Sequence, residues 1–162
     1  MKARKLFTAL LALTAVTAVA CDDEDEDIDA PPDTQTLSAD LTGAAERPTP
    51  VTTNATGDAE FVISTSGTTT TITYTVTVSG LSGPITAAHI HGPANASVAA
   101  NVIVPLSAVT GSGTSFTGSF TTTGNSTIDM ATLVTHMLAG NTYINIHTAA
   151  NPNGEIRGQI ID

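Results

Sequence analysis

The sequence is poor in cysteine, tryptophan and positive charge. Its 162 residues include one cysteine and no tryptophan, and aromatic residues make up 4% of the chain. A single cysteine excludes an intramolecular disulfide. Lysine and arginine together number 5, against 15 aspartate and glutamate residues. Because so acidic a chain repels a phosphate backbone, we expect no nucleic-acid partner.

The N-terminus lacks a hydrophobic run long enough for a membrane span. Lys2, Arg4 and Lys5 precede an uncharged, largely apolar stretch over residues 6–20. At about 15 residues this stretch is shorter than the roughly 20 that a helix needs to cross a bilayer. Basic residues, a short apolar stretch and small residues in that order are typical of a signal peptide. We assign it to residues 1–20, which predicts export.

Cys21 follows this segment directly. The sequence Ala18-Val19-Ala20-Cys21 resembles the lipobox of bacterial lipoproteins, in which the cysteine is lipidated. Lipidation accounts for an unpaired thiol in an exported chain, because the modification uses the sulfur. Ordinary cleavage after Ala20 is the alternative. We therefore expect the membrane as a partner, through a lipid anchor, and a location in the cell envelope or at the cell surface.

The segment after Cys21 is strongly acidic. Without residues 1–20 the chain keeps Arg47 and Arg157, and these two cations against 15 acids give a net charge of −13. Most residues between Asp22 and Asp29 are acidic. Such a run repels itself and offers little apolar surface to bury. We expect residues 21–37 to form a lipidated, disordered tether, and a sorting signal is the alternative role for its acids.

Residues 38–162 are predicted to form one all-β domain. Apolar side chains alternate with threonine over residues 70–78, as a strand with one buried face requires. Glycine and proline separate this segment from others of similar length. About seven or eight short strands of this kind predict a Greek-key sandwich or barrel. The predicted strands are residues 38–41, 59–64, 70–78, 85–91, 102–106, 115–121, 142–147 and 155–161.

One segment has helical periodicity instead. Its apolar residues recur at i, i+3, i+4, i+7 and i+8, and Gly140 follows as a stop signal. Residues 126–129 fit a capping box. These signals predict one short connecting helix over residues 128–139. The residues of its apolar stripe are Met130, Leu133, Val134, Met137 and Leu138.

Histidines suggest a metal site. His89 and His91 are two apart on a predicted strand, so they share a face, to which Ile85 and Ala87 are also assigned. Two neighbouring imidazoles can form half of a metal site. His147 lies on another predicted strand and shares its face with Tyr143 and Asn145. His136 falls off the apolar stripe of the predicted helix and is expected at its edge.

Several motifs resemble the CHRD domain, which is named for its repeats in the extracellular antagonist chordin. The similarity covers residues 38–160, and it implies an extracellular or envelope β domain without an established catalytic activity. The motifs are Leu41-Thr42-Gly43-Ala44-Ala45-Glu46, Gly57-Asp58-Ala59, Tyr74-Thr75-Val76-Thr77-Val78-Ser79-Gly80-Leu81, Ala87-Ala88-His89-Ile90-His91-Gly92-Pro93-Ala94, Tyr143-Ile144-Asn145-Ile146-His147-Thr148 and Asn153-Gly154-Glu155-Ile156-Arg157-Gly158-Gln159-Ile160.

If the motifs of this family meet in one place, His89, His91 and His147 converge there. Copper or zinc is then the expected metal, with Glu46 and Glu155 as further candidate ligands. Arg157 is expected to hold a carboxylate, as a structural ion pair with Glu155. The alternative is a purely structural network, in which the histidines bond to loop backbone and the ion pair braces two strands.

Two classes of function remain open from the sequence. The first is a non-enzymatic envelope module that binds an extracellular protein or matrix partner, because no nucleophile with an assignable base is evident. The second is a copper- or zinc-dependent oxidoreductase resembling Cu/Zn superoxide dismutase, which also carries a His-x-His pair on a β-barrel strand. The aspartate ligand of that family is not evident here, and the net charge would repel superoxide. Metal binding without turnover lies between the two.

Overall fold

The computed structural model describes residues 33–106, 113–124 and 128–162. All eight predicted strand segments are found there. The elements are β1 (Asp33–Thr42), the 3-10 helix η1 (Gly43–Ala45), β2 (Thr56–Ser66), β3 (Thr69–Ser79), β4 (Ile85–His91), β5 (Val102–Pro105), β6 (Ser115–Phe120), α1 (Met130–Leu138), β7 (Thr142–Thr148) and β8 (Ile156–Ile160). The assigned signal peptide, Cys21 and residues 22–32 lie outside the described residues. No described helix is both long and apolar enough to cross a membrane.

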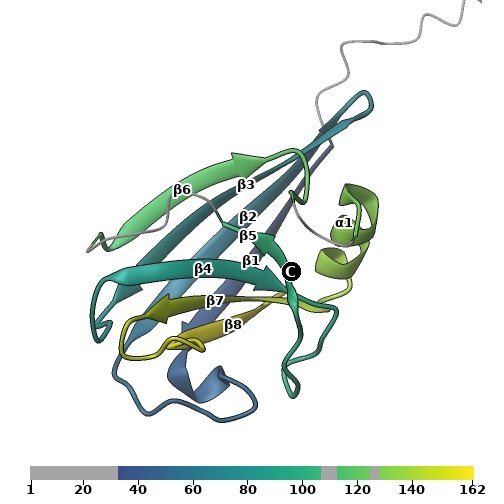
Figure 1. Cartoon of the computed structure of the whole chain (residues 1–162). Helices are drawn as coiled ribbons and strands as arrows, with labels where there is room; N and C mark the ends of the chain where they lie inside the picture. The colour runs from purple at the N-terminus through teal and green to yellow at the C-terminus, as the bar shows by residue number, and fades with distance from the viewer. Residues whose placement is uncertain (1–32, 107–112, 125–127) are drawn as a thin grey trace, which may run out of the picture.

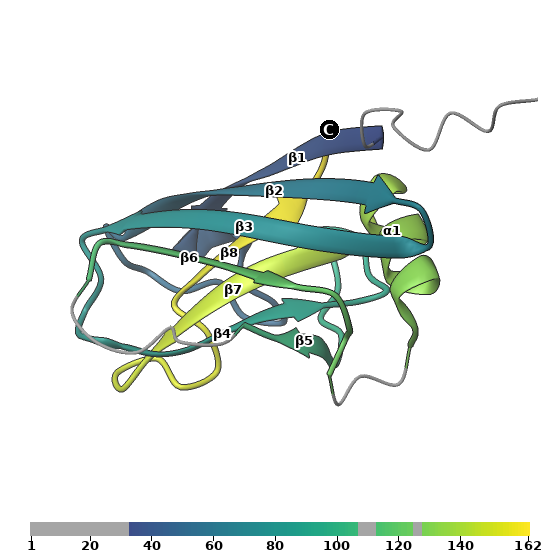
Figure 2. The same ribbon diagram turned by 90° about the horizontal axis from the view of Figure 1, so that it is seen from above.

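The strands form one antiparallel sheet that curls on itself. Its order is β5-β4-β7-β8-β1-β2-β3-β6. Figure 1 shows β4, β7 and β8 in front of β1, β2 and β3, and Figure 2 shows these two parts of the sheet as facing layers with α1 at one end. In the described part of the chain, β5 and β6 remain as the two edges of the sheet. The predicted all-β class is confirmed, in the form of a half-barrel.

Strand β3 has the predicted two-residue periodicity. Ile72 and Val76 are completely buried, whereas Thr73 and Thr75, which lie between them, are exposed. The strand pairs along its whole length with β2, across a turn in which Gly67 has a φ of +56°. Each buried aliphatic side chain contributes about 1.5–3 kcal/mol to folding. The hairpin therefore supplies much of the inner face of the half-barrel.

Strand β1 begins earlier than the sequence indicates. Residues 33–37 were expected to belong to the disordered tether, but they are part of β1 and pair with β2, with Asp33 opposite Thr65 and Leu37 opposite Phe61. The first four of these residues are exposed, so they lack the apolar alternation that marks a strand. Backbone hydrogen bonds to β2 hold them instead. The ordered domain therefore includes residues 33–37.

Helix α1 is shorter than predicted and begins two residues later. Asp129 is its N-cap, and the side chain of Asp129 accepts a hydrogen bond from the backbone N–H of Thr132. The first two residues of the predicted capping box lie outside the described residues. Leu133 and Met137 are fully buried, as the apolar stripe requires. Gly140, with a φ of +66°, follows the helix as expected.

Candidate metal centre

The candidate site lies on the outer face of the sheet formed by β4, β7 and β8. Every residue of β7 is buried: Ile144 and Ile146 belong to the core, while Tyr143 and His147 on the other face contact the backbone of Ala100 and Pro152. Side chains from this face donate to carbonyl groups of residues 94–100. We call it the outer polar face, and its residues are His89, His91, Tyr143, Asn145, His147, Arg157 and Gln159.

A bulge in β4 decides which residues share this face. Ile85 is opposite Thr148 and Ala87 is opposite His147, so β4 has one extra residue between these pairs. Ile85 consequently joins the core with Ala88 and Ile90. The assignment of Ile85 to the histidine face was therefore wrong. The assignment of Ala87, His89 and His91 to one face holds, because the bulge lies before them.

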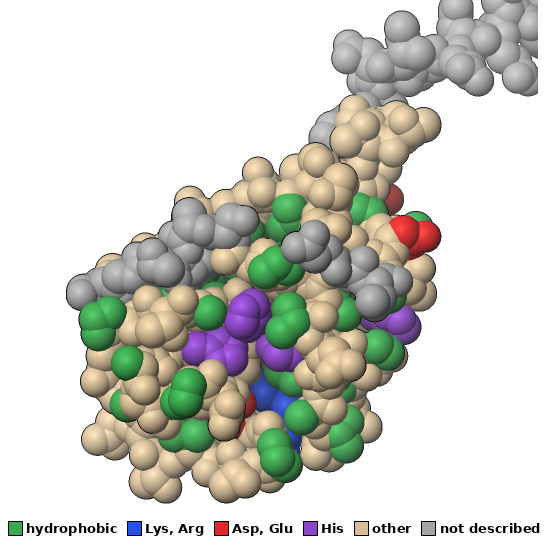
Figure 3. All heavy atoms as spheres, viewed as in Figure 1, with side chains coloured by type: hydrophobic (Ala, Val, Ile, Leu, Met, Phe, Trp, Pro, Cys, Tyr) green, Lys and Arg blue, Asp and Glu red, His purple; other side chains and the backbone are tan. Residues whose placement is uncertain are grey.

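The structure brings the three predicted histidines together. Nδ1 of His89 lies 2.9 Å from Nε2 of His147, and their ring centroids are 4.7 Å apart. The rings of His89 and His91 have centroids 5.7 Å apart. One nitrogen from each ring can be chosen so that all three lie within 4.8 Å of one another. Figure 3 shows histidine side chains gathered at the surface of this face, beside a basic side chain.

Backbone carbonyls orient two of the rings. Nδ1 of His147 lies 3.0 Å from the carbonyl oxygen of Pro152, and Nδ1 of His91 lies 2.9 Å from that of Ala100. A carbonyl oxygen can only accept, so each Nδ1 carries the proton. Each neutral ring is thereby left with a lone pair on Nε2. Such backbone contacts commonly fix the tautomer and aim of metal-binding histidines.

The lone pairs on Nε2 have protein partners. Nε2 of His147 accepts a hydrogen bond from Nδ1 of His89, which leaves Nε2 of His89 with its own lone pair. Nε2 of His91 lies 3.0 Å from the side-chain amide of Asn145, at the atom assigned as Oδ1. A neutral His91 requires the amide NH₂ at this position, because Nδ1 already donates. The cluster can thus be satisfied with all three rings neutral.

The surroundings favour the neutral rings. Burial, together with the positive charges that His147 and His91 would carry, lowers the pKa of His89 to about 4. Burial also lowers the pKa of His91 and of His147, although their backbone hydrogen bonds oppose this. All three imidazoles are therefore uncharged at neutral pH, with one proton on each ring. Neutral imidazole is the form that binds metal ions.

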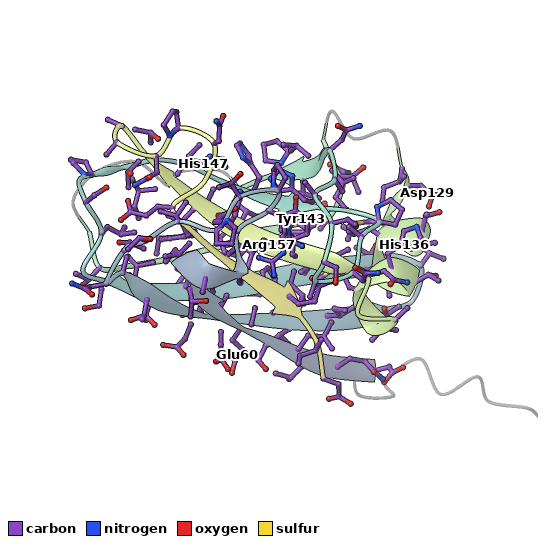
Figure 4. The ribbon with its side chains drawn as sticks, turned by 90° about the horizontal axis from the view of Figure 1, so that it is seen from below. Glu60, Asp129, His136, Tyr143, His147 and Arg157 are labelled. Carbon is purple, nitrogen blue, oxygen red and sulfur yellow. The ribbon has the colours of Figure 1, made fainter. Side chains whose placement is uncertain are left out.

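Tyr143 holds one ring of the cluster in place. Its ring stacks on His91 with centroids 4.8 Å apart and an interplanar angle of 6°. The guanidinium carbon of Arg157 lies 3.4 Å from the centroid of the Tyr143 ring. Nη2 of Arg157 donates to the carbonyls of Asn95 and Val98. Figure 4 shows Tyr143 and Arg157 side by side under β7 and β8.

Glu46 is buried within reach of the charge on Arg157 and is not part of the cluster. It is 3% exposed, and its Oε1 makes no hydrogen bond to the described residues. Burial raises its pKa to about 7, against the lowering effect of the positive charge on Arg157. Nη1 of Arg157 is also buried without a hydrogen-bond partner among the described residues. The group of described residues that could hold a metal ion contains neither Glu46 nor Glu155.

Glu155 has a structural role that differs from the predicted ion pair with Arg157. Its Oε1 accepts from the backbone N–H of Ser82 at 2.9 Å and from Thr53 Oγ1 at 3.0 Å. Its Oε2 accepts from Ser82 Oγ at 2.5 Å and from Thr148 Oγ1 at 2.6 Å. Burial raises its pKa, but these hydrogen bonds outweigh burial and lower the value to about 2. Because Glu155 precedes β8, the two-residue periodicity that was expected to align it with Arg157 does not apply.

The remaining histidine is apart from the cluster. His136 lies on α1 and is half-buried, as expected for the edge of the helix. Figure 4 shows it beside α1, away from His147. The roles of the Ala100 and Pro152 carbonyls could not be predicted from the sequence, because any residue supplies a carbonyl. The contacts of Tyr143 also went unpredicted, although its place on the face of His147 was correct.

Comparison with known proteins identifies the family. The family model of the CHRD domain matches residues 37–160. No match was found among curated proteins or among solved structures. The matched range includes β2 to β8, β1 from Leu37 onward and each residue of the candidate metal centre. The chain therefore belongs to the CHRD domain family, as the motifs around His89, His91, His147 and Arg157 indicated.

Proposed function

We propose that this chain is a lipid-anchored CHRD module of the cell envelope that binds a divalent first-row metal ion without turnover. The observation that carries the metal-binding part is the meeting of three neutral imidazoles, from His89, His91 and His147, within 4.8 Å. Such rings are suited to zinc or copper. An extracellular protein or matrix component is the second expected partner. The loop of residues 94–100, which lies over the outer polar face, would be exposed to it.

The oxidoreductase alternative gains no support from this geometry. The metal-binding set of the described residues consists of three histidines and contains no aspartate. The nearby acids have other environments, because Glu155 accepts four hydrogen bonds and Glu46 is buried within reach of the charge on Arg157. Binding or storage of a metal ion requires no further group. We therefore propose binding rather than catalysis.

Metal binding should raise the melting temperature of the protein. We expect zinc(II) or copper(II) at micromolar concentration to stabilise the full chain at pH 7.5, because a ligand present at 100 times its Kd contributes about 2.7 kcal/mol. The chain should carry Cys21→Ser and no affinity tag. His147→Ala should remove the shift, since it removes the ring that Pro152 orients. Thermal melts and calorimetric titration measure both effects.

His136→Ala is the matched control, because it removes a histidine from α1 that is outside the cluster. It should keep the wild-type shift. Absence of saturable binding to the wild type at micromolar metal would show that the three rings form a structural network instead. The same conclusion would follow if His136→Ala alone abolished binding.

Anchoring is tested separately at Cys21. We expect the wild-type precursor, expressed in a bacterium, to incorporate a palmitate analogue, and Cys21→Ser to lose the label. Stability should not change between the two proteins, because the described domain begins after this residue. Gel fluorescence of the clicked analogue measures labelling. Equal labelling of both proteins, or none of the wild type, would contradict the lipid anchor.

A further inference from the structure

We infer that the outer edge of β6 pairs with the same strand of a second copy of this chain, so that two domains form one continuous sheet about a twofold axis. Ser115, Thr117 and Ser119 supply the backbone groups of this interface. Neither a bound metal nor the lipid anchor is needed for the pairing. The direction of the backbone groups of β6, the absence of protecting features on this strand and the distribution of charge all lead to it.

The backbone of β6 is hydrogen-bonded on one side only. The strand lies at the end of the sheet beside β3, and Figure 1 shows it as the outermost strand there. Just before β6, the N–H of Val78 donates to the carbonyl of Thr114, the residue directly opposite. Because bonded positions alternate along an antiparallel pair, even-numbered residues of β6 bond to β3 and odd-numbered residues direct N–H and C=O outward. These outward residues have no backbone partner in the described part of the chain, and they are Ser115, Thr117 and Ser119.

Strand β6 lacks the features that keep an edge strand from pairing. Exposed edges are commonly blocked by charged side chains, proline or bulges. The 6 residues of Ser115–Phe120 include no charge and no proline, and their register with β3 has no shift. A flat, uncharged edge of this kind is a template for another strand.

The opposite edge of the sheet is protected. Strand β5 has 4 residues, and its register with β4 shifts beside His91. The N–H of Leu106 donates to the carbonyl of Ala88 on β4. By the same alternation Pro105 occupies an outward position, where it has no N–H to offer. The two edges therefore differ, and only β6 is suited to pairing.

The distribution of charge favours a second copy as the occupant. No aspartate, glutamate, lysine or arginine occurs between Glu60 and Asp129. This stretch contains β3, β4, β5 and β6 completely, which are the two ends of the sheet. Two copies of so acidic a chain repel each other. Approach through β6 brings uncharged strands together and keeps the acids of the two copies apart.

One register uses all the outward groups. With the twofold axis at Thr117, this residue faces its own copy, and Ser115 faces Ser119 of the second copy. Residues paired in this manner exchange two backbone hydrogen bonds, and hydroxyl side chains directly opposite one another are favourable pairs. On the inner face, the rings of Phe116 and Phe120 pack on the core but remain half-buried. The added strand would cover their exposed edges.

Sedimentation equilibrium tests the pairing. The full chain with Cys21→Ser and no affinity tag is measured up to about 1 mM with a chelator present, because one pair of strands is a small interface, and we expect a Kd on the order of 0.1 mM. Thr117→Lys should weaken the dimer at least about tenfold, since it places two like charges directly opposite each other. Thr73→Lys is the matched control. It adds the same charge at an exposed position of β3, one strand away from the edge, and should leave the dimer intact.

A cross-link tests the register. Cys21→Ser leaves the chain without cysteine, so Thr117→Cys introduces a single thiol at the twofold axis. Hydrogen-bonded residues on opposite strands have Cα atoms about 5.5 Å apart, which a disulfide spans. Oxidation with diamide should therefore convert Thr117→Cys largely to a covalent dimer, whereas Thr73→Cys should remain mostly monomeric.

Three results would overturn the inference. A chain that sediments as a monomer at about 1 mM would leave the edge of β6 to a strand of a different protein. A dimer that Thr117→Lys retains would lie elsewhere on the surface. Equal cross-linking of Thr117→Cys and Thr73→Cys would reflect random collision. Circular dichroism of each variant verifies that the sheet is intact, and the cysteine pair decides the matter if Thr117→Lys fails to fold.

Discussion

Glu155→Gln should lower the free energy of unfolding by about 3 kcal/mol and the melting temperature by about 10 °C. The carboxylate is fully buried and accepts four hydrogen bonds, from Thr53, Thr148 and twice from Ser82. A glutamine amide of the same shape can accept at its oxygen only. Its NH₂ group would face donors, and buried donors without an acceptor cost about 1–3 kcal/mol each. Chemical denaturation at pH 7 measures the difference.

Glu60→Gln is the matched control, because Glu60 is an exposed glutamate on β2 (Figure 4). It should change stability by less than about 0.5 kcal/mol. The deficit of Glu155→Gln should also depend on pH. The folded pKa of Glu155 is about 2 against 4.5 in the unfolded chain, so its contribution is complete above pH 4.5 and is lost as the pH falls toward 2. A deficit that persisted unchanged at pH 2 would show that packing, not the charge, is responsible.

Glu46→Gln should have the opposite dependence on pH. The folded pKa of Glu46 is about 7 against 4.5 unfolded, so its contribution is complete below pH 4.5 and is lost as the pH rises through 7. Between pH 4.5 and pH 8 the variant should therefore gain about 3 kcal/mol relative to the wild type. Denaturation of both proteins, with a chelator present, measures this change.

The quantity to follow is the difference in the free energy of unfolding between variant and wild type. His89 also makes stability depend on pH, in the opposite direction to Glu46. The folded pKa of His89 is about 4 against 6.5 unfolded, so its contribution is complete above pH 6.5 and is lost as the pH falls toward 4. This loss is common to wild type and variant and cancels between them. A constant difference over the whole range would mean that folding does not raise the pKa of Glu46.

The strands could be predicted because their signal is local. Alternation over residues 70–78 required only one buried face, and glycine and proline marked the turns. The start of β1 could not be predicted in this way, because its first residues are polar and are held by pairing with β2. The bulge in β4 could not be predicted from the sequence either. An extra residue changes the face of Ile85 without changing the composition of the strand.

The candidate site was predictable in its members but not in its contacts. Periodicity placed His89 and His91 on one face, and the family motifs suggested that His147 joins them. In the pairing of β4 with β7, His89 is directly opposite Asn145 and therefore diagonal to His147. The sequence alone does not specify this register. Glu155 illustrates the limit. Its partner Ser82 is 73 positions away, and no local pattern connects them.

The position of β1 in the sheet has a consequence for the order of folding. β1 lies between β8 and β2, so the first described strand pairs with the last. Ser38 and Ile161 exchange backbone hydrogen bonds across nearly the whole domain. Contacts so distant in sequence form slowly, because a long loop must close first. Strands β1, β2 and β3 can pair before β8 is present, but the sheet becomes continuous only when the C-terminal strand β8 joins β1.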